Sequence, residues 1–427
     1  MFDDGRYTPQ RDLSRLVLPD VGQLRDTGNA WEPYQLIGSD GAVVEPVRMF
    51  FAELQGAGRS PSTLRSYGMD LLRWFRFLWA EDVRWNHATR VEARDFCRWM
   101  ALANKPFRAH WRNRAAVGAR HSTEPPVPAH PDVNLVTGKP YPGRKFAAST
   151  RAHSETVLRR FYDFHMEEGT GPILNPFPLD RSRRAGRRHA HHNPMDHFKN
   201  ETQGRYRPRV PKRLPRRIPD ELFNALFATL QHHRDRALLA AWVSTGARAQ
   251  ELLDLRQKDA DPGQQLIQVT RKGTRAEQLL PTSPDFFVWL RLYQQELHRA
   301  GVPWGHNQPL WWTLRRPWRP LNYHAARAML NRTNELLGSN WSLHDLRHTA
   351  SYRMAEDREL PLTHVQWVLG HAHLSTTEIY LAAGLDDVVR EVLAHHTRRA
   401  LQSERPPKQL AGGYKPESLN VLFGQRP

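Results

Sequence analysis

Apolar positions at helical spacing dominate the first half of the chain. They recur every three or four residues over 44–54 and again over 64–79, which is the period of one buried helix face. Ser60 and Pro61 separate the two runs and are typical of an N-cap followed by proline at the first helical position. Similar spacing predicts helices in two later stretches, 91–100 and 149–165. The pattern therefore predicts an all-helical domain over residues 44–180.

The second half mixes helical periodicity with one alternating stretch. Residues 265–281 carry alternating apolar positions that lead into a Lys-Gly pair and a return strand, which predicts a β-hairpin. A tryptophan-rich stretch, 304–320, is expected to cover the hydrophobic core, with base stacking as the alternative. Helical spacing predicts helices over 220–230, 234–244, 286–298, 321–336 and 344–353. We expect a mostly α, two-domain chain, in which an all-helical domain precedes an α+β domain with a small antiparallel hairpin or sheet.

Composition marks the boundaries between these parts. The turn-rich residues 1–43 form an arm with no assigned function, expected to pack on the adjoining helical domain. Six prolines near 122–143 predict an exposed insertion in the first domain. The remaining segments are a basic interdomain linker at 181–217, the second domain at 218–400 and a flexible tail at 401–427. An amphipathic pattern over 385–401 predicts a last helix, packed on its own domain or on a neighbouring protomer.

The net charge indicates a polyanionic partner. The chain carries +18 at pH 7 and has a pI of about 10.4, which favours nucleic acid first and an anionic membrane surface second. Thirteen Lys and Arg residues against two acidic ones place +11 of this charge in residues 181–219. We expect this run to lie along a phosphate backbone, and a solvated tract is the alternative. The candidate DNA contacts are Arg183, Arg184, Arg187, Arg188, Arg205, Arg207, Arg209, Lys212 and Arg213.

Hydropathy and cysteine content narrow the class of protein. The mean hydropathy is −0.68, and neither a bilayer-spanning run nor a signal-peptide pattern is evident. The single cysteine, Cys97, excludes an internal disulfide and a cysteine-based zinc site. Its apolar neighbours predict a buried structural thiol. We expect a protein of the bacterial cytoplasm or nucleoid, with no membrane partner.

Residues 341–380 carry the side chains best suited to chemistry. Arg347 offers a planar set of donors that matches phosphate oxygens. His344 and His371 can donate to an oxygen or move a proton near neutral pH. Tyr380 is a nucleophile once its hydroxyl is activated. These groups can bind, polarise and attack a phosphodiester without a metal ion.

The spacing of these residues resembles the active-site signature of the tyrosine recombinases, the phage integrase family. Residues 344–347 match its H-x-x-R element, and residues 369–380 match its L-G-H…Y element. Upstream, the sequence TGARAQEL at 245–252 resembles the family's first-arginine element. Residues 60–75 resemble the start of the family's helical core-binding domain.

The resemblance implies roles for three residues outside the signature stretch. Arg248 would be a phosphate clamp, and Glu251 would be its buried support. Lys272, at the hairpin turn, would reach the scissile phosphate as general acid. A lysine there stands out, because only Lys258 and Lys272 occur between residues 213 and 407 of an arginine-rich chain, and lysine gives up a proton more readily than arginine.

The implied reaction is strand cleavage and rejoining of DNA through a 3′-phosphotyrosyl intermediate, without metal, ATP or other cofactor. The catalytic set would be Arg248, Lys272, His344, Arg347, His371 and Tyr380. The implied partners are double-stranded DNA with specific recombination sites, further copies of the chain in a tetramer, and accessory or companion recombinase proteins. Integration, or transposition of the tyrosine recombinase type, would be the biological outcome.

Three alternatives remain open at this stage. A type IB topoisomerase would use the same chemistry and reseal the same strand. A catalytically silent DNA-binding accessory protein would not need a nucleophilic tyrosine. A metallohydrolase with His344 and His348 as ligands is disfavoured, because the H-E-x-x-H pattern is absent. In the first domain, Ser154 and Tyr162 are candidates for phosphate contact, with core or surface roles as the alternatives.

Overall fold

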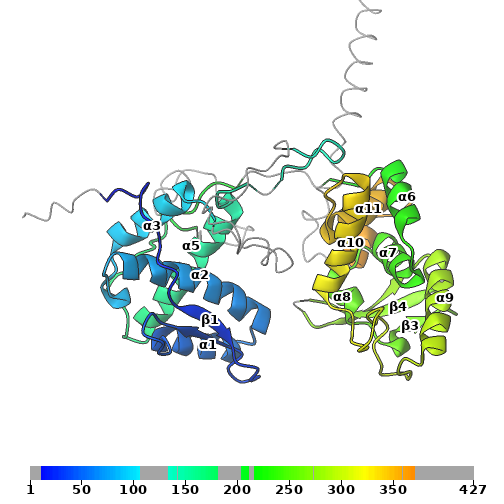
Figure 1. Ribbon diagram of the computed structural model, residues 1–427, viewed down its shortest axis with the longest axis horizontal. Helices are drawn as coiled ribbons and strands as arrows, with labels where there is room; N and C mark the ends of the chain where they lie inside the picture. The colour runs from blue at the N-terminus through cyan, green and yellow to red at the C-terminus, as the bar shows by residue number, and fades with distance from the viewer. Residues whose placement is uncertain are drawn as a thin grey trace, which may run out of the picture. The chain divides into compact units, whose positions relative to one another are not determined.

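The chain folds into two compact units. The computed structural model describes residues 11–105, 133–141, 143–180, 203–210, 216–272, 274–357 and 359–370. Unit 1 comprises residues 1–133 and 140–212, and unit 2 comprises residues 134–139 and 213–427 (Figure 1). Among the described helices, none combines the length and the apolar character that crossing a bilayer requires. The expected helix at 385–401 and the expected tail at 401–427 lie outside the described residues.

Unit 1 is built from helices and one small hairpin. Its elements are β1 (Gln23–Asp26), β2 (Tyr34–Ile37), α1 (Glu45–Gly56), α2 (Pro61–Ala80), η1 (Trp85–His87), α3 (Arg90–Leu102) and α5 (Ala148–Glu167). Ser60 occupies the N-cap of α2, but its hydroxyl bonds the side chains of Ser62 and Thr63 instead of the helix backbone. The predicted helices of this region are present, and their predominance confirms the mostly α fold class.

Aromatic side chains form the core of unit 1. Trp74 of α2 is fully buried, and its ring meets those of Phe77, Phe96 and Tyr162. The Tyr162 hydroxyl accepts from Trp74 Nε1 (2.9 Å) and donates to the Trp85 carbonyl (2.9 Å). Ser154 is likewise fully buried. Contact of Tyr162 or Ser154 with phosphate is therefore wrong as a prediction, because both belong to the packed face of α5.

The residues of the expected N-terminal arm pack on unit 1 and contain the β1–β2 hairpin. The strands pair antiparallel, with Gln23 opposite Ile37. Leu13 and Leu36 join the apolar core. Arg11 forms ion pairs with three carboxylates of the helical region, those of Glu81, Glu92 and Asp95. The sequence did not predict these strands, because four-residue strands are too short to show a clear alternation.

Residues 203–210, one of the two described parts of the basic tract, also pack on unit 1. Arg205 N donates to the Pro178 carbonyl (2.9 Å), and Gly204 forms a β-bridge with Leu179. Gly204 lies so close to α5 that a Cβ atom there would overlap the carboxylate of Glu155. Arg207 donates to Thr156 Oγ1 (2.9 Å). A part of the expected linker is therefore folded onto the helical unit.

Unit 2 surrounds a three-stranded antiparallel sheet with helices. The sheet order is β3 (Ala260–Asp261), β4 (Leu266–Thr270), β5 (Glu277–Pro281), and Thr270 pairs with Glu277 next to the hairpin turn. The predicted hairpin is confirmed, while the two-residue strand β3 was not predicted. The elements are α6 (Asp220–Thr229), α7 (His233–Thr245), α8 (Ala249–Leu253), η4 (Gln257–Asp259), β3 (Ala260–Asp261), β4 (Leu266–Thr270), β5 (Glu277–Pro281), α9 (Pro284–Ala300), α10 (Tyr323–Leu337), α11 (Leu343–Glu356) and α12 (Leu362–Leu369).

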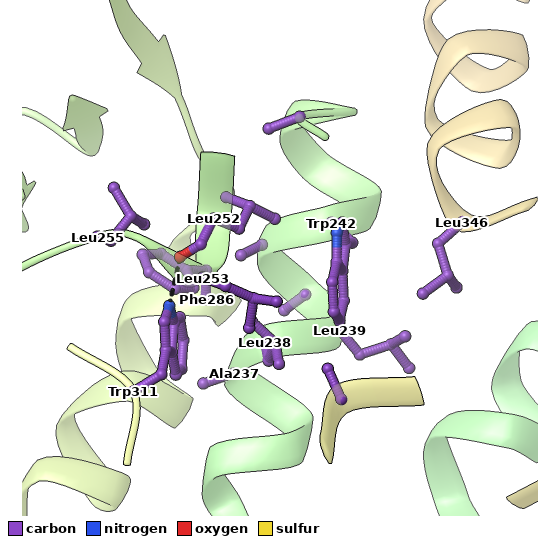
Figure 2. Packing of buried hydrophobic residues seen from close by; sticks show 14 of the residues in the cluster. Ala237, Leu238, Leu239, Trp242, Leu252, Leu253, Leu255, Phe286, Trp311 and Leu346 are labelled. Carbon is purple, nitrogen blue, oxygen red and sulfur yellow. Dashed lines mark hydrogen bonds between the residues drawn. The ribbon is translucent and has the colours of Figure 1, made fainter. Parts of the chain in front are cut away.

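Helix α7 is the centre of unit 2. Its residues Leu238 and Trp242 are fully buried, and the helix packs against α9 and α11 (Figure 2). Trp311 is buried beside it and donates through Nε1 to the Leu252 carbonyl (2.7 Å) at the end of α8. Trp312 is also in the core, whereas Trp304 is half exposed. The tryptophan-rich stretch therefore covers the core, as predicted, and this packing holds α8 next to α7.

Candidate active site

Arg248 lies at a sharp turn between two helices of unit 2. Helix α7 ends at Thr245, and Gly246 follows in the left-handed conformation (φ 61°), which glycine adopts without strain. Its position leaves no room for a side chain, because a Cβ atom would come within 2.8 Å of Leu369 Cδ2. Arg248 then takes the N-cap position of α8. The Thr-Gly pair thereby places the arginine at the start of a short helix, with its side chain about one third exposed.

The carboxylate of Glu251 ties this turn to the hairpin. Its oxygens accept from the Arg248 backbone N (3.0 Å) and Arg248 Nη1 (3.0 Å). They also accept from the backbone N of Lys272 (3.1 Å) and from Arg271 Nη1 (2.9 Å). Burial alone raises the pKa of this carboxyl, but the bonds from Arg248 and Lys272 outweigh it, and the pKa is lowered. Glu251 is therefore a buried anion that holds two candidate residues at fixed backbone positions.

Arg271 is a buried site residue that was not predicted. Its side chain is 5% exposed and pairs with Glu251. Nε donates to Gln278 Oε1 (2.7 Å), and Nη2 donates to the Val368 carbonyl. One guanidinium thus joins α8, β5 and the end of α12. Sequence offers only a weak signal for such a residue, namely its position next to the hairpin turn.

Arg347 lies in the interior of unit 2 on helix α11. It is 4% exposed, and its Nη1 donates to the Gly246 carbonyl (2.7 Å) while its Nη2 donates to the Leu369 carbonyl (2.8 Å). The guanidinium has five N–H donors in a plane. These bonds fix the plane of Arg347 against the turn that carries Arg248.

Positive charge surrounds His344 on the first turn of α11. Loss of solvent lowers the pKa of His344, and the charges of Arg347, Arg248 and Lys139 lower it further, against the opposing effect of Asp345. The ring of His348 lies 4.2 Å from that of His344, centroid to centroid. Burial and then His344 lower the pKa of His348 to about 4. Both imidazoles are therefore neutral near pH 7.

The C-terminal end of α12 is held by three side chains, two from the β4–β5 hairpin and one from α11. Its last three carbonyls, at residues 367, 368 and 369, accept in turn from Gln278 Nε2, Arg271 Nη2 and Arg347 Nη2. The final carbonyls of a helix have no partner within the helix, so these donors replace the missing bonds. Gly370 closes the helix in the left-handed conformation (φ 61°). The end of α12 is thereby fixed at residue 370.

The structure describes four of the six candidate catalytic residues. Arg248 and the backbone of Lys272 meet at Glu251, and Arg347 and His344 follow on α11; the side chain of Lys272 is exposed. His371 and Tyr380 lie outside the described residues. Among the candidate DNA contacts, Arg205, Arg207 and Arg209 are described and exposed, whereas Arg183, Arg184, Arg187, Arg188, Lys212 and Arg213 lie outside the described residues.

Two other predictions concern groups that bind metals or react as thiols. Within the ranges that the structure describes, no three His, Cys, Asp or Glu side chains are grouped so that they could hold a metal ion. Burial raises the pKa of the Cys97 thiol to about 12. A thiol with such a pKa is a poor nucleophile at neutral pH.

Comparisons with known proteins agree with this arrangement. The phage integrase family matches residues 216–384, and the phage integrase N-terminal SAM-like domain matches residues 47–120. The tyrosine recombinase XerC of Chlamydia caviae is 31% identical over 190 residues, which cover 43% of this chain and 59% of that protein. The chain therefore spans less than two thirds of the length of that relative.

Solved structures share the fold at low sequence identity. The XerH site-specific recombinase bound to a palindromic difH substrate, in a post-cleavage complex, has a TM-score of 0.51 and 15% identity, with 83% of this chain and 85% of that chain covered. A lambda integrase dimer bound to a COC′ core site has a TM-score of 0.50 and 14% identity, with 79% of this chain and 94% of that chain covered. These likenesses show the fold alone.

Proposed function

The chain belongs to the phage integrase family of tyrosine recombinases, and from this premise we propose that it cuts and rejoins DNA strands through Tyr380. The hydroxyl oxygen of Tyr380 attacks the phosphorus of one phosphodiester. The bond from phosphorus to the 5′ oxygen breaks, and a 3′-phosphotyrosyl bond forms. Because this bond keeps the energy of the phosphodiester, a 5′-hydroxyl can reverse the step on the same strand or on another one.

Two arginines offset the charge of the reacting phosphate. Arg248 lies at the start of α8, and Arg347 lies on α11. Both adjoin the turn at Gly246, because Arg248 follows it in the chain and Arg347 donates to its carbonyl. Their guanidinium groups match the geometry of non-bridging phosphate oxygens. Donors held in place before the reaction stabilise the charge that develops in the transition state.

Proton transfer is assigned to the remaining side chains. His344, whose pKa is lowered, is neutral near pH 7 and can accept the proton of the Tyr380 hydroxyl. His371 donates a hydrogen bond to the phosphate. Lys272 supplies the proton to the departing 5′ oxygen, a role that arginine fills poorly because it does not readily lose a proton. The protons balance, because His344 takes up one from Tyr380 and Lys272 releases one to the departing 5′ oxygen.

The observation that carries this proposal is the joint contact of Arg248 and Lys272 with Glu251. The two residues are 24 positions apart and lie on different elements. A buried carboxylate that accepts hydrogen bonds from both residues holds them close together, as is needed if their side chains must reach one ligand. The double-stranded DNA, its specific sites and a tetrameric assembly are part of the same proposal, as are companion recombinase proteins.

Covalent trapping tests the proposed function. Wild type and Tyr380→Phe would be incubated, in chelator, with labelled nicked duplexes taken from the DNA that flanks the gene. We expect a denaturation-resistant protein–DNA band for wild type and none for Tyr380→Phe, which lacks the nucleophile but keeps its DNA affinity. Product analysis then separates strand exchange from resealing of the same strand, the outcome for a type IB topoisomerase.

Three results would contradict the proposal. A band that persists in Tyr380→Phe would assign the nucleophile elsewhere. Binding without any band, on DNA that a related recombinase cleaves in the same assay, would favour a silent DNA-binding protein. Activity lost in chelator would favour a metallohydrolase.

A further inference from the structure

A six-residue segment of the proline-rich insertion belongs to unit 2. The chain enters unit 2 at Asn134, leaves it after Lys139 and returns to it at Arg213. We call residues 134–139, Asn-Leu-Val-Thr-Gly-Lys, the strap. Nothing in the periodicity of the insertion distinguishes these residues from their neighbours.

The strap is a closed loop with its own hydrogen bonds. Asn134 Oδ1 accepts from the backbone N of Val136 (3.0 Å) and Thr137 (2.8 Å), an Asx-type turn. Asn134 N donates to the Lys139 carbonyl (2.9 Å), so the ends of the loop meet. Gly138 takes the left-handed conformation (φ 61°), and a Cβ atom there would lie 3.1 Å from Arg216 Nη1. The loop therefore has a defined shape that can dock.

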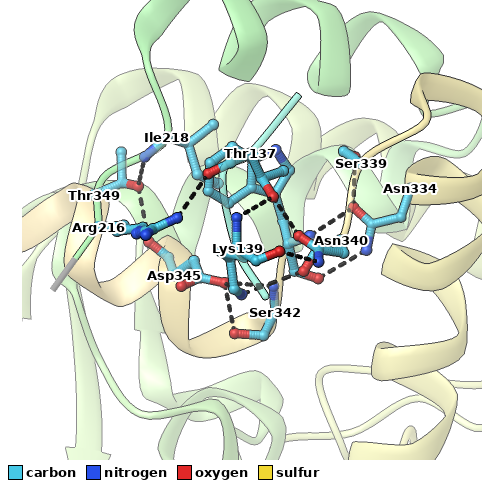
Figure 3. A network of polar contacts seen from close by, with 11 residues as sticks. Thr137, Lys139, Arg216, Ile218, Asn334, Ser339, Asn340, Ser342, Asp345 and Thr349 are labelled. Atoms are coloured by element: carbon cyan, nitrogen blue, oxygen red, sulfur yellow. Dashed lines mark hydrogen bonds and ion pairs between the residues drawn. The ribbon is translucent and has the colours of Figure 1, made fainter. Parts of the chain in front are cut away.

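The strap docks at the junction between α10 and α11 (Figure 3). Asn134 is 3% exposed, and its Nδ2 donates to the Gly338 carbonyl (2.8 Å). The Thr137 hydroxyl bonds Asn340 Oδ1, and the Thr137 carbonyl accepts from Arg216 Nη1 (3.1 Å). Each of these part-buried polar contacts pairs a donor with an acceptor, which distinguishes a specific docking site from incidental contact.

Lys139 connects the strap to the helix that carries the candidate site. Its Nζ donates to the Asn340 carbonyl (3.2 Å) and forms an ion pair with Asp345 Oδ2. The same oxygen of Asp345 accepts from the backbone N and the hydroxyl of Ser342, both at 2.7 Å, and so caps α11. His344 is the residue before Asp345. The ammonium group of the strap therefore fixes the turn on which His344 stands.

We propose that the strap is a positioning element for the candidate active site and that Lys139, through Asp345, holds the first turn of α11 and His344 in place. Lys139 is thus a positioning residue and makes no contact with the reacting phosphate. Its catalytic consequence rests on the proposed function, whereas its docking does not. At both ends the strap continues into residues of unit 1. Release of the strap would therefore change the candidate active site while the helices of unit 2 stayed unchanged.

Hydrogen exchange on the full chain tests the docking. Lys139→Met should speed amide exchange about tenfold in residues 134–139 and 340–347, because one charged hydrogen-bonded contact contributes roughly that factor. Exchange in α9 should not change. Lys139→Arg, which keeps the cation, should restore protection. Lys145→Met is the matched control, since Lys145 is exposed and precedes α5.

The titration of His344, followed by NMR, and a cleavage assay test positioning. Charged or titratable groups facing His344 are Asp345, Arg347 and His348 of its own helix, Arg248 of the α7–α8 turn, and Lys139. Loss of Lys139 should raise the pKa of His344. Lys139→Met should also slow cleavage about tenfold while DNA affinity is unchanged. Lys139→Arg should recover the wild-type cleavage rate.

The outcomes distinguish this proposal from the proposed function. Unchanged exchange over 340–347 together with an unchanged titration of His344 would overturn the strap's role. Faster exchange with a normal cleavage rate would make the strap structural and would also overturn positioning. If wild type forms no covalent adduct at all, the proposed function fails, and the exchange and titration results still decide whether Lys139 positions His344.

Discussion

At the residue scale, buried charges give the candidate site its geometry. Glu251 and Arg271 are both nearly excluded from solvent and are paired with each other. Such a pair adds little net stability, because the cost of removing two charges from water offsets their attraction. Removing one member, however, leaves an uncompensated charge in the interior. The pair therefore serves to orient the site, because each partner also forms hydrogen bonds with backbone groups at or near candidate catalytic residues.

Arg271→Met should destabilise unit 2 and impair cleavage. The substitution leaves Glu251 with one fewer cation and frees the Val368 carbonyl, so we expect a loss of about 3 kcal/mol in the free energy of unfolding. Denaturant titration would measure it. Arg299→Met is the control, because Arg299 is exposed on α9. A loss as small as that of the control would mean that Arg271 does not organise the site.

His348 should make stability depend on pH. Its folded-state pKa is about 4, against an ordinary value of 6.5, so the unfolded chain binds a proton that the folded chain excludes. Its contribution is intact above pH 6.5 and is lost as pH falls towards 4. Allowing for partial exposure, we expect a loss of about 2 kcal/mol.

The comparison that isolates this effect is His348→Gln. Unfolding free energies of wild type and variant would be measured at pH 7.5 and pH 4.5. The variant should lose less stability between the two values than wild type does. Equal losses would assign the pH dependence to other groups.

At the scale of elements, local pattern predicted most of the helices and the hairpin. It did not predict α12, which has only eight residues, or β3, which exists as a two-residue strand because β4 lies beside it. The resemblance indicated Arg248, Glu251 and Lys272 as a set. It did not indicate Arg271 or Lys139, because neither residue belongs to the motifs that carry the resemblance. Their contacts, with partners 20 and 206 positions away in the chain, are evident only in the folded protein.

Gly370→Ala tests the held end of α12. The left-handed conformation alone costs a side chain about 1 kcal/mol, and a Cβ atom at residue 370 would also lie 3.0 Å from Arg271 Nε. We expect a total loss of about 2 kcal/mol in unfolding free energy. Gly301→Ala is the matched control, because Gly301 has φ 70° and open space around its missing side chain. Equal losses for the two variants would show that Arg271 tolerates the methyl group.

At the scale of the whole molecule, the two units hold different parts of the proposed function. The described candidate catalytic residues lie in unit 2, as do Arg216 and Arg217 at the end of the basic tract, whereas residues 203–210 of the tract lie in unit 1. Each unit has its own apolar core. Affinity for DNA and chemistry on DNA should therefore respond to substitution separately.

Salt dependence of DNA binding tests this separation. Replacing Arg205 and Arg209 by glutamine should reduce the slope of log K against log salt by about one for each lost phosphate contact. The cleavage rate at saturating DNA should stay as in wild type. Arg299→Gln controls for the loss of charge. An unchanged slope would remove residues 203–210 from the DNA-contacting surface.

Because of the strap, the boundary between the units is set by contacts in the folded chain and does not fall at a single position in the gene. A coding fragment that begins at residue 213 lacks six residues of its own unit, and one that ends at residue 212 carries six residues with no docking site. Crossovers at the basic tract between two related genes would unite a strap with an Asp345 of different ancestry. Such chimaeras would inherit every candidate catalytic side chain and keep the contact that steadies His344 only where the strap of one parent fits the α10–α11 junction of the other.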